Sequence, residues 1–221
     1  CKLSLWLVSL DRDLPFSFVD DKVLLGNTLL GITSLDQLRK LHIAPEQAGT
    51  WQLGSVTDTD IDATIKTASE IRGQLAEEID EFDLARNAKA KRRLLTEFST
   101  KTAQLRRIAD GIIAAGLREG GKPGKKLNEQ YENLRIAVSK AYPMDGKPTD
   151  PQYLDGILEA GLTPTGVTDY ERWKPIHWVL ELPDVMIDHG GFDAVVGNPP
   201  FLGGKKLTGA MGAGIREWYI N

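Results

Sequence analysis

The sequence predicts an α/β fold in which two short core strands are separated by a long, mainly α-helical insertion. Residues 22–25 and 192–196 are short apolar runs, each closed by glycine and asparagine, a pattern that suits a strand opening into a loop. More than a hundred residues separate the two runs, and a connection of that length must contain structure of its own. The periodicity of that connection is helical, which completes the α/β prediction.

We expect the chain to begin in the end of a buried helix over residues 2–10. Its apolar positions, spaced three and four residues apart, are Leu3, Trp6, Leu7 and Leu10. A proline-containing connection over 14–18 leads from there to the first strand. The chain begins without methionine inside this amphipathic segment and ends just after another one starts. We therefore expect an internal fragment of a longer protein.

Two long amphipathic segments within the insertion predict an antiparallel helix hairpin over about residues 58–117. The first segment is acidic at its polar positions (Glu70, Glu77, Glu78, Asp80, Glu81) and the second is basic (Lys89, Lys91, Arg92, Arg93, Arg106, Arg107). The two faces could pair across the hairpin, or the arginines could contact nucleic-acid phosphates. A third helix is expected over 127–141, followed by linkers rich in proline and glycine through Gly166.

Composition excludes several classes of protein. A net charge of −4 argues against a uniformly basic nucleic-acid-binding surface, although a local basic groove is compatible with it. The single cysteine, Cys1, excludes an internal disulfide framework, and His42, His177 and His189 lack metal-ligand spacing. The longest apolar run, residues 3–10, is too short to span a bilayer. We expect a cytoplasmic protein that holds no metal.

The segment with the clearest chemistry is Asn198-Pro199-Pro200-Phe201, directly after the second expected strand. An adenine amino group is a poor nucleophile, and two fixed acceptors for its hydrogens turn the nitrogen lone pair toward a methyl donor. The Asn198 side-chain oxygen and the Pro199 carbonyl can be those acceptors, and Phe201 can stack on a base swung out of the duplex. The alternative is a proline turn, with Asn198 as a turn residue and Phe201 as a core anchor.

These residues resemble a known family. HWVLELPDV (177–185) and GGFDAVVGNPPFLGGKKLTG (190–209) are similar to the Eco57I-type N6-adenine DNA methyltransferases of restriction-modification or bacteriophage-exclusion systems, whose motif IV reads (D/N)PP(Y/F). Near the N-terminus, KLSLWL and LPFSFVDDKVLLGNTLLG resemble the stretch that carries motif III in that family. The helical middle matches only in being a long insertion.

The resemblance implies a partial Rossmann-like, S-adenosylmethionine-dependent methyltransferase domain, divided into core residues 1–32, a helical insertion over 33–174 and core residues 175–221. It also implies that Asn27 lies near the adenine of S-adenosylmethionine. The other implied site residues are Asn198, Pro199, Pro200 and Phe201 for catalysis, with Lys205 and Lys206 at DNA phosphates.

The implied partners are duplex DNA with a flipped adenine and the remainder of the parent chain. No glycine-rich motif I precedes Asn27, so we expect the main cofactor-binding motif to lie outside this chain and the fragment alone to be inactive. Two alternatives stay open. One is methylation of a glutamine amide in protein, and the other is a non-catalytic helical interaction module.

Overall fold

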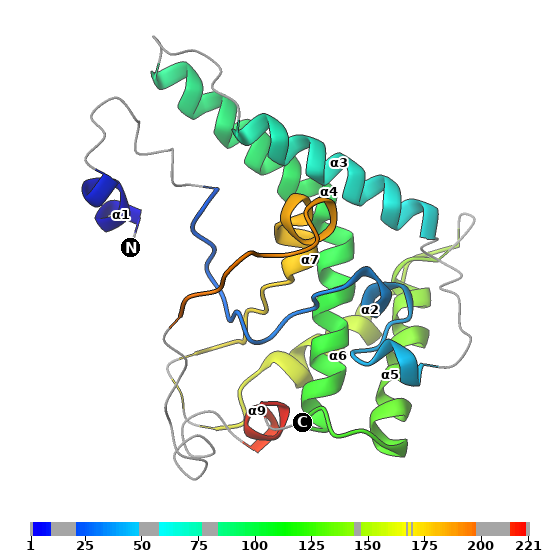
Figure 1. Ribbon diagram of the computed structural model, residues 1–221. Helices are drawn as coiled ribbons and strands as arrows, with labels where there is room; N and C mark the ends of the chain where they lie inside the picture. The colour runs from blue at the N-terminus through cyan, green and yellow to red at the C-terminus, as the bar shows by residue number, and fades with distance from the viewer. Residues whose placement is uncertain are drawn as a thin grey trace.

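The computed structural model describes residues 2–9, 21–48, 58–76, 84–143, 147–166, 168, 170–197 and 213–219. Helices are the regular structure of these residues (Figure 1). In chain order they are α1 (Lys2–Ser9), α2 (Leu35–Arg39), η2 (Pro45–Gln47), α3 (Asp58–Ala76), α4 (Leu84–Arg118), α5 (Lys125–Ala141), α6 (Gln152–Leu162), α7 (Trp178–Glu181), η3 (Asp184–Asp188) and α9 (Ala213–Trp218).

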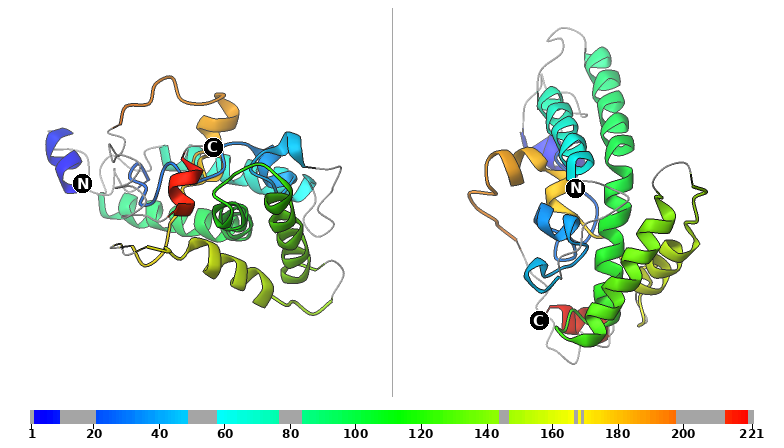
Figure 2. Two further views of the ribbon diagram at one scale, coloured as in Figure 1. Left: turned by 90° about the horizontal axis from the view of Figure 1, so that it is seen from below. Right: turned by 90° about the vertical axis from the view of Figure 1, so that its right-hand side faces the viewer.

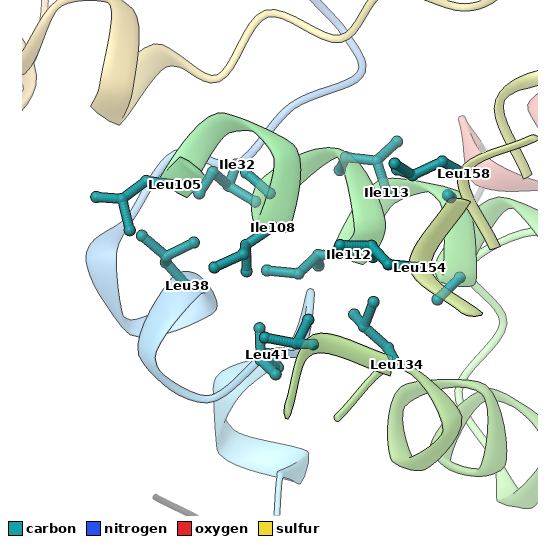
Figure 3. Packing of buried hydrophobic residues seen from close by; sticks show 14 of the residues in the cluster. Ile32, Leu38, Leu41, Leu105, Ile108, Ile112, Ile113, Leu134, Leu154 and Leu158 are labelled. Atoms are coloured by element: carbon teal, nitrogen blue, oxygen red, sulfur yellow. The ribbon is translucent and has the colours of Figure 1, made fainter. Parts of the chain in front are cut away.

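Helix α4 is the central helix and contacts α2, α3, α5, α6, α7 and α9. Its 35 residues span roughly 50 Å at the α-helical rise of about 1.5 Å per residue. The C-terminal half of α4 is covered by α5 and α6, with further contacts from α2, α7 and α9 (Figures 1 and 2). The main core forms there, as Figure 3 shows, from side chains that include Ile32, Leu38, Leu41, Leu105, Ile108, Ile112, Ile113, Leu134, Leu154 and Leu158. Burial of each such side chain contributes roughly 1.5–3 kcal/mol to folding.

The N-terminal half of α4 runs along α3 and projects away from α5 and α6 (Figures 1 and 2). Ile61 and Ile65 of α3 still belong to the main core. A second, smaller apolar cluster joins the two helices and consists of Ala68, Ile71, Leu75, Leu94 and Phe98. Helix α4 changes direction along its length (Figure 1). Three threonine hydroxyls, those of Thr96, Thr100 and Thr102, donate to the carbonyl four residues back. Such back-bonding commonly bends helices.

The α/β prediction is wrong for this chain. None of the described residues lies in a strand; the described fold is all-helical, and its β-type pairing is one isolated parallel bridge between Asn27 and Pro175. The two expected strands are irregular, and their apolar side chains are half-buried (Val23 and Leu24) or exposed, as in Leu25 at 87%, Val195 at 83% and Val196 at 97%. An apolar run becomes a strand only where a neighbour completes its backbone hydrogen bonds, and neither run has such a neighbour among the described residues.

The structure also differs from the sequence prediction in α1 and over residues 152–162. The apolar side chains described on α1 are exposed, with Leu3 at 57% and Val8 at 77%, so this helix is not buried as expected. Residues 152–162, expected as linker, form α6, which buries Leu154, Leu158 and Leu162 at intervals of four residues. Within the described residues, no helix is both long and apolar enough to cross a membrane. The division into segments 1–32, 33–174 and 175–221 stays a prediction.

Candidate functional site

A pocket of about 620 Å³ lies where residues 25–29 meet residues 170–174, with Tyr219 of the C-terminal segment at its wall. We refer to it as the Asn27 pocket. Its lining residues are Leu25, Gly26, Asn27, Thr28, Leu29, Tyr170, Glu171, Arg172, Trp173, Lys174 and Tyr219.

Backbone hydrogen bonds hold the two walls of the pocket together. The Asn27 N–H donates to the Lys174 carbonyl over 2.6 Å, and the Ile176 N–H donates to the Asn27 carbonyl over 3.1 Å. The Trp178 indole N–H adds a third link by donating to the Thr28 carbonyl over 3.1 Å. Segments about 150 residues apart in the sequence are thus fixed side by side around Asn27.

Two glycines allow this close approach. A Cβ on Gly31 would lie 1.9 Å from the Ile176 carbonyl oxygen, and a Cβ on Gly26 would lie 2.6 Å from the Lys174 carbonyl oxygen. Both distances are far below any contact between such atoms, and backbone rather than a flexible side chain stands in the way. Neither position accepts a larger residue unless the two walls separate.

His177 anchors the walls to α4. The imidazole is fully buried, its Nδ1 accepts the Ile32 N–H over 3.3 Å, and its Nε2 lies 3.1 Å from Asp110 Oδ1 on α4. Because Nδ1 accepts a hydrogen bond, the geometry assigns the ring proton to Nε2, which donates to the carboxylate. One side chain therefore ties both loop segments to the central helix.

The Asn27 amide faces Tyr219. Its Nδ2 donates to the Tyr219 hydroxyl over 3.2 Å, and its Oδ1 accepts the Leu29 N–H over 3.0 Å. An amide oxygen carries two lone pairs and an amide nitrogen two hydrogens, so each atom retains one further hydrogen bond for a ligand. Asn27 can thus offer a donor and an acceptor from one rigidly held group.

Two further aromatic residues, Tyr170 and Trp173, line the pocket. Tyr170 and Trp173 have ring centroids 5.5 Å apart at an interplanar angle of 40°. Trp173 is 4% exposed, and its backbone N–H donates to the Leu162 carbonyl over 2.8 Å, whereas Tyr170 is 59% exposed. Glu171, Arg172 and Lys174 are also exposed. The buried Trp173 supports the exposed Tyr170 ring, and one accessible aromatic face beside a fixed amide suits a flat, polar ring better than acid–base chemistry.

Of the residues predicted for the site, the structure describes Asn27, which it places in this pocket. Asn198, Pro199, Pro200, Phe201, Lys205 and Lys206 lie outside the described residues. Among the described residues, no group of three or more His, Cys, Asp or Glu side chains is arranged to hold a metal ion.

The sequence did not predict the aromatic residues that line the pocket, which are Tyr170, Trp173 and Tyr219. Tyr219 reaches Asn27 across 192 residues, and no spacing in a single sequence signals such a contact. Tyr170 and Trp173 did carry a weak signal, since two aromatic residues flank the charged pair Glu171-Arg172 in a segment rich in proline and glycine.

A family model described as the Eco57I restriction-modification methylase matches residues 1–220. The match includes the helical middle of the chain as well as the two segments that carry the recognisable motifs. No curated protein and no solved structure matches the chain.

Proposed function

The chain belongs to the Eco57I restriction-modification methylase family, and from this premise we propose that the protein transfers a methyl group from S-adenosylmethionine to adenine N6 in duplex DNA, for restriction-modification or phage defence. A methylase must hold a methyl donor and present an acceptor atom to it. The observation that carries the proposal is the Asn27 pocket, which offers a fixed amide and aromatic faces in a chain of this family.

The groups lining the pocket fit the adenine of the cofactor. The free lone pair on Asn27 Oδ1 can accept from an exocyclic amino group, and the second Nδ2 hydrogen can reach a ring nitrogen. The exposed Tyr170 ring offers a stacking face, and a volume of about 620 Å³ falls within the ordinary range for small-molecule pockets. S-adenosylmethionine supplies an electrophilic methyl group when bound. The role of this chain is to bind and orient its adenine end.

The target base is assigned to Asn198, Pro199, Pro200 and Phe201 on the basis of the sequence. The Asn198 side-chain oxygen and the Pro199 carbonyl accept the two N6 hydrogens, and Pro200 limits the movement of that backbone. Phe201 stacks on the adenine outside the duplex. Lys205 and Lys206 follow Phe201 after three intervening residues and contact DNA phosphate. Acceptors of this kind activate the nitrogen without a covalent enzyme intermediate.

The test uses the protein as encoded by its gene, tritium-labelled S-adenosylmethionine and unmethylated duplex DNA, followed by nucleoside analysis. We expect label in N6-methyladenine. Asn27→Leu should raise the KM for S-adenosylmethionine at least tenfold while kcat stays within about twofold. Asn27→Asp keeps an acceptor and should stay within about threefold of wild type in KM.

Asn198→Ala should instead lower kcat by about a hundredfold to a thousandfold, with S-adenosylmethionine binding nearly intact, because its oxygen acts on the substrate amino group. Label in cytosine or in a protein glutamine amide would contradict the proposed reaction. An Asn27→Leu enzyme with an unchanged KM would remove the Asn27 pocket from the cofactor site.

A further inference from the structure

The N-terminal half of α4, residues 84–104, concentrates positive charge. It carries six basic side chains and a single acidic one, Glu97, in a chain whose net charge is −4. The C-terminal part of the same helix is buried in the main core. The basic half packs on α3 and projects away from α5 and α6 (Figures 1 and 2).

Three of these cations lie on the side of α4 that faces away from α3. The side toward α3 is marked by the buried side chains of Leu94, Phe98 and Thr102. At about 100° per residue, Lys89, Arg92 and Arg93 fall on the opposite side of the helix. All three are exposed. We call these three residues the free face of α4.

The arginines nearer the body of the molecule have carboxylate partners. Arg72 on α3 pairs with Asp184, and Arg107 pairs with Asp155. Arg106 pairs with Glu181 over 3.0 Å. In the part of the chain that the structure describes, no carboxylate pairs with Lys89, Arg92 or Arg93. The positive charge of the free face is therefore available to a partner.

We propose that the free face of α4 binds the phosphate backbone of duplex DNA. The proposal rests on the proposed function for the choice of DNA as the polyanion. From Lys89 to Arg93 the helix rises about 6 Å, and each strand of duplex DNA presents one phosphate for about every 3.4 Å of the duplex axis, so a stretch of this length carries phosphates on both strands. The residues of the next turn on this side, Thr96 and Thr100, are small and keep their hydroxyls bonded to the helix backbone.

A membrane surface is disfavoured as the partner. Helices that lie on membranes bury large apolar side chains beside their cations. Among the side chains of this half that the structure describes, Leu94 and Phe98 are buried against α3 and Leu95 packs partly buried against the same cluster. Charge without an apolar stripe suits phosphate contacts that position DNA without reading its sequence.

The experiment compares two matched triple variants of the full chain. Lys89→Gln with Arg92→Gln and Arg93→Gln removes three positive charges from the free face. Lys122→Gln with Lys125→Gln and Lys126→Gln removes three exposed positive charges at the start of α5. Both variants change the net charge equally, and glutamine is a good helix former. Circular dichroism checks that helix content is retained in each.

Binding of a fluorescent 30-base-pair duplex is measured by anisotropy between 50 and 200 mM salt, with two unrelated sequences. The free-face variant should lose at least tenfold in affinity at 50 mM salt. Its slope of log affinity against log salt should fall by about 2 to 3, since each phosphate contact contributes about 0.9. The α5 variant should stay within twofold of wild type for both sequences.

Equal losses in the two variants would overturn the proposal, because bulk charge rather than the free face would then drive binding. Wild-type protein that does not bind the duplex, or that prefers polyglutamate, would overturn it as well. S-adenosylmethionine binding and methyl transfer are measured separately. If the protein binds DNA through the free face but transfers no methyl group, only the proposed function is contradicted. If the free-face variant still transfers methyl groups and binds DNA as tightly as wild type, only this inference is contradicted.

Discussion

The two halves of α4 differ in what covers them. Residues 105–118 are packed by α5 and α6, and a nearly unbroken run of their side chains is buried. Residues 84–104 have α3 as their main neighbour and bury a narrow stripe. Arg106 and Arg107, at the boundary, are paired with carboxylates of α7 and α6, whereas the free face has no carboxylate partner among the residues that the structure describes.

One helix can therefore combine a core element and a solvent-facing element. A wide apolar surface makes the C-terminal half a core element, which also anchors the Asn27 pocket through Asp110 and His177. A narrow stripe gives the N-terminal half one partner and leaves most of its circumference to solvent. A helix that has only one neighbour can present charge to a ligand without first breaking contacts with the rest of the fold.

A charged residue in the C-terminal half of α4 should destabilise the protein most. Ile112 is fully buried, and Ile112→Asp should abolish cooperative folding, because burying an unpaired carboxylate costs more than about 4 kcal/mol. Leu94→Asp in the other half should melt the contact with α3 and leave the body folded. Thermal melts followed by circular dichroism distinguish these outcomes. Identical loss of the transition in both variants would mean that α4 folds as one unit.

Replacing Gly31, in the wall of the Asn27 pocket, and Gly73, on α3, by alanine should change the free energy of unfolding in opposite directions. Gly31→Ala places a Cβ against the Ile176 carbonyl and should lower the free energy of unfolding by about 2–3 kcal/mol. Gly73, on α3, has open space where a Cβ would lie. Gly73→Ala should therefore raise the free energy of unfolding by about 0.5–1 kcal/mol, because alanine lowers the backbone entropy of the unfolded chain. Urea titrations measure both. A neutral Gly31→Ala would show that the pocket walls separate easily.

A smaller effect is expected from pH. His42 is 2% exposed, and burial lowers its pKa from 6.5 despite the hydrogen bond to Asn128. The unfolded chain therefore takes up this proton at higher pH than the folded chain does. The contribution of the neutral, buried His42 to the free energy of unfolding is fully present well above pH 6.5. It should be lost as the pH drops through that value toward the lower pKa of the folded state.

Urea titrations at pH 8 and pH 5.5 should show this loss in wild type, and His42→Gln should reduce it. His189 is exposed, so His189→Gln is the matched control and should leave the pH profile unchanged. A His42→Gln profile identical to that of wild type would assign the acid sensitivity to other groups.

The sequence predicts helices correctly where the helical spacing of apolar residues repeats over several turns. Residues 58–76, 84–118 and 125–141 are helices in the structure, and their apolar spacing indicated as much. Short apolar runs were not sufficient, because a strand depends on a neighbour that the run itself cannot specify. Val195 and Val196 illustrate this, since both look like core residues in the sequence and are exposed in the structure.

The candidate site could be predicted only in part for a related reason. Asn27 was identified through a family resemblance, whereas its contact with Tyr219 depends on how the whole chain folds. The Gly31 approach to Ile176 is likewise invisible in the sequence, where Gly31 is one glycine among 22. Motifs identify chemistry, but contacts between distant segments determine the geometry in which it acts.

Hydrogen–deuterium exchange of the chain, with and without a 30-base-pair duplex, tests most directly whether the two halves of α4 have separate roles. Without DNA, amides of residues 105–118 should exchange far more slowly than those of 84–104, because the core half opens only with the body. Added duplex should slow exchange within 84–104 and leave 105–118 unchanged. Equal exchange in the two halves, or DNA protection confined to 105–118, would contradict the account.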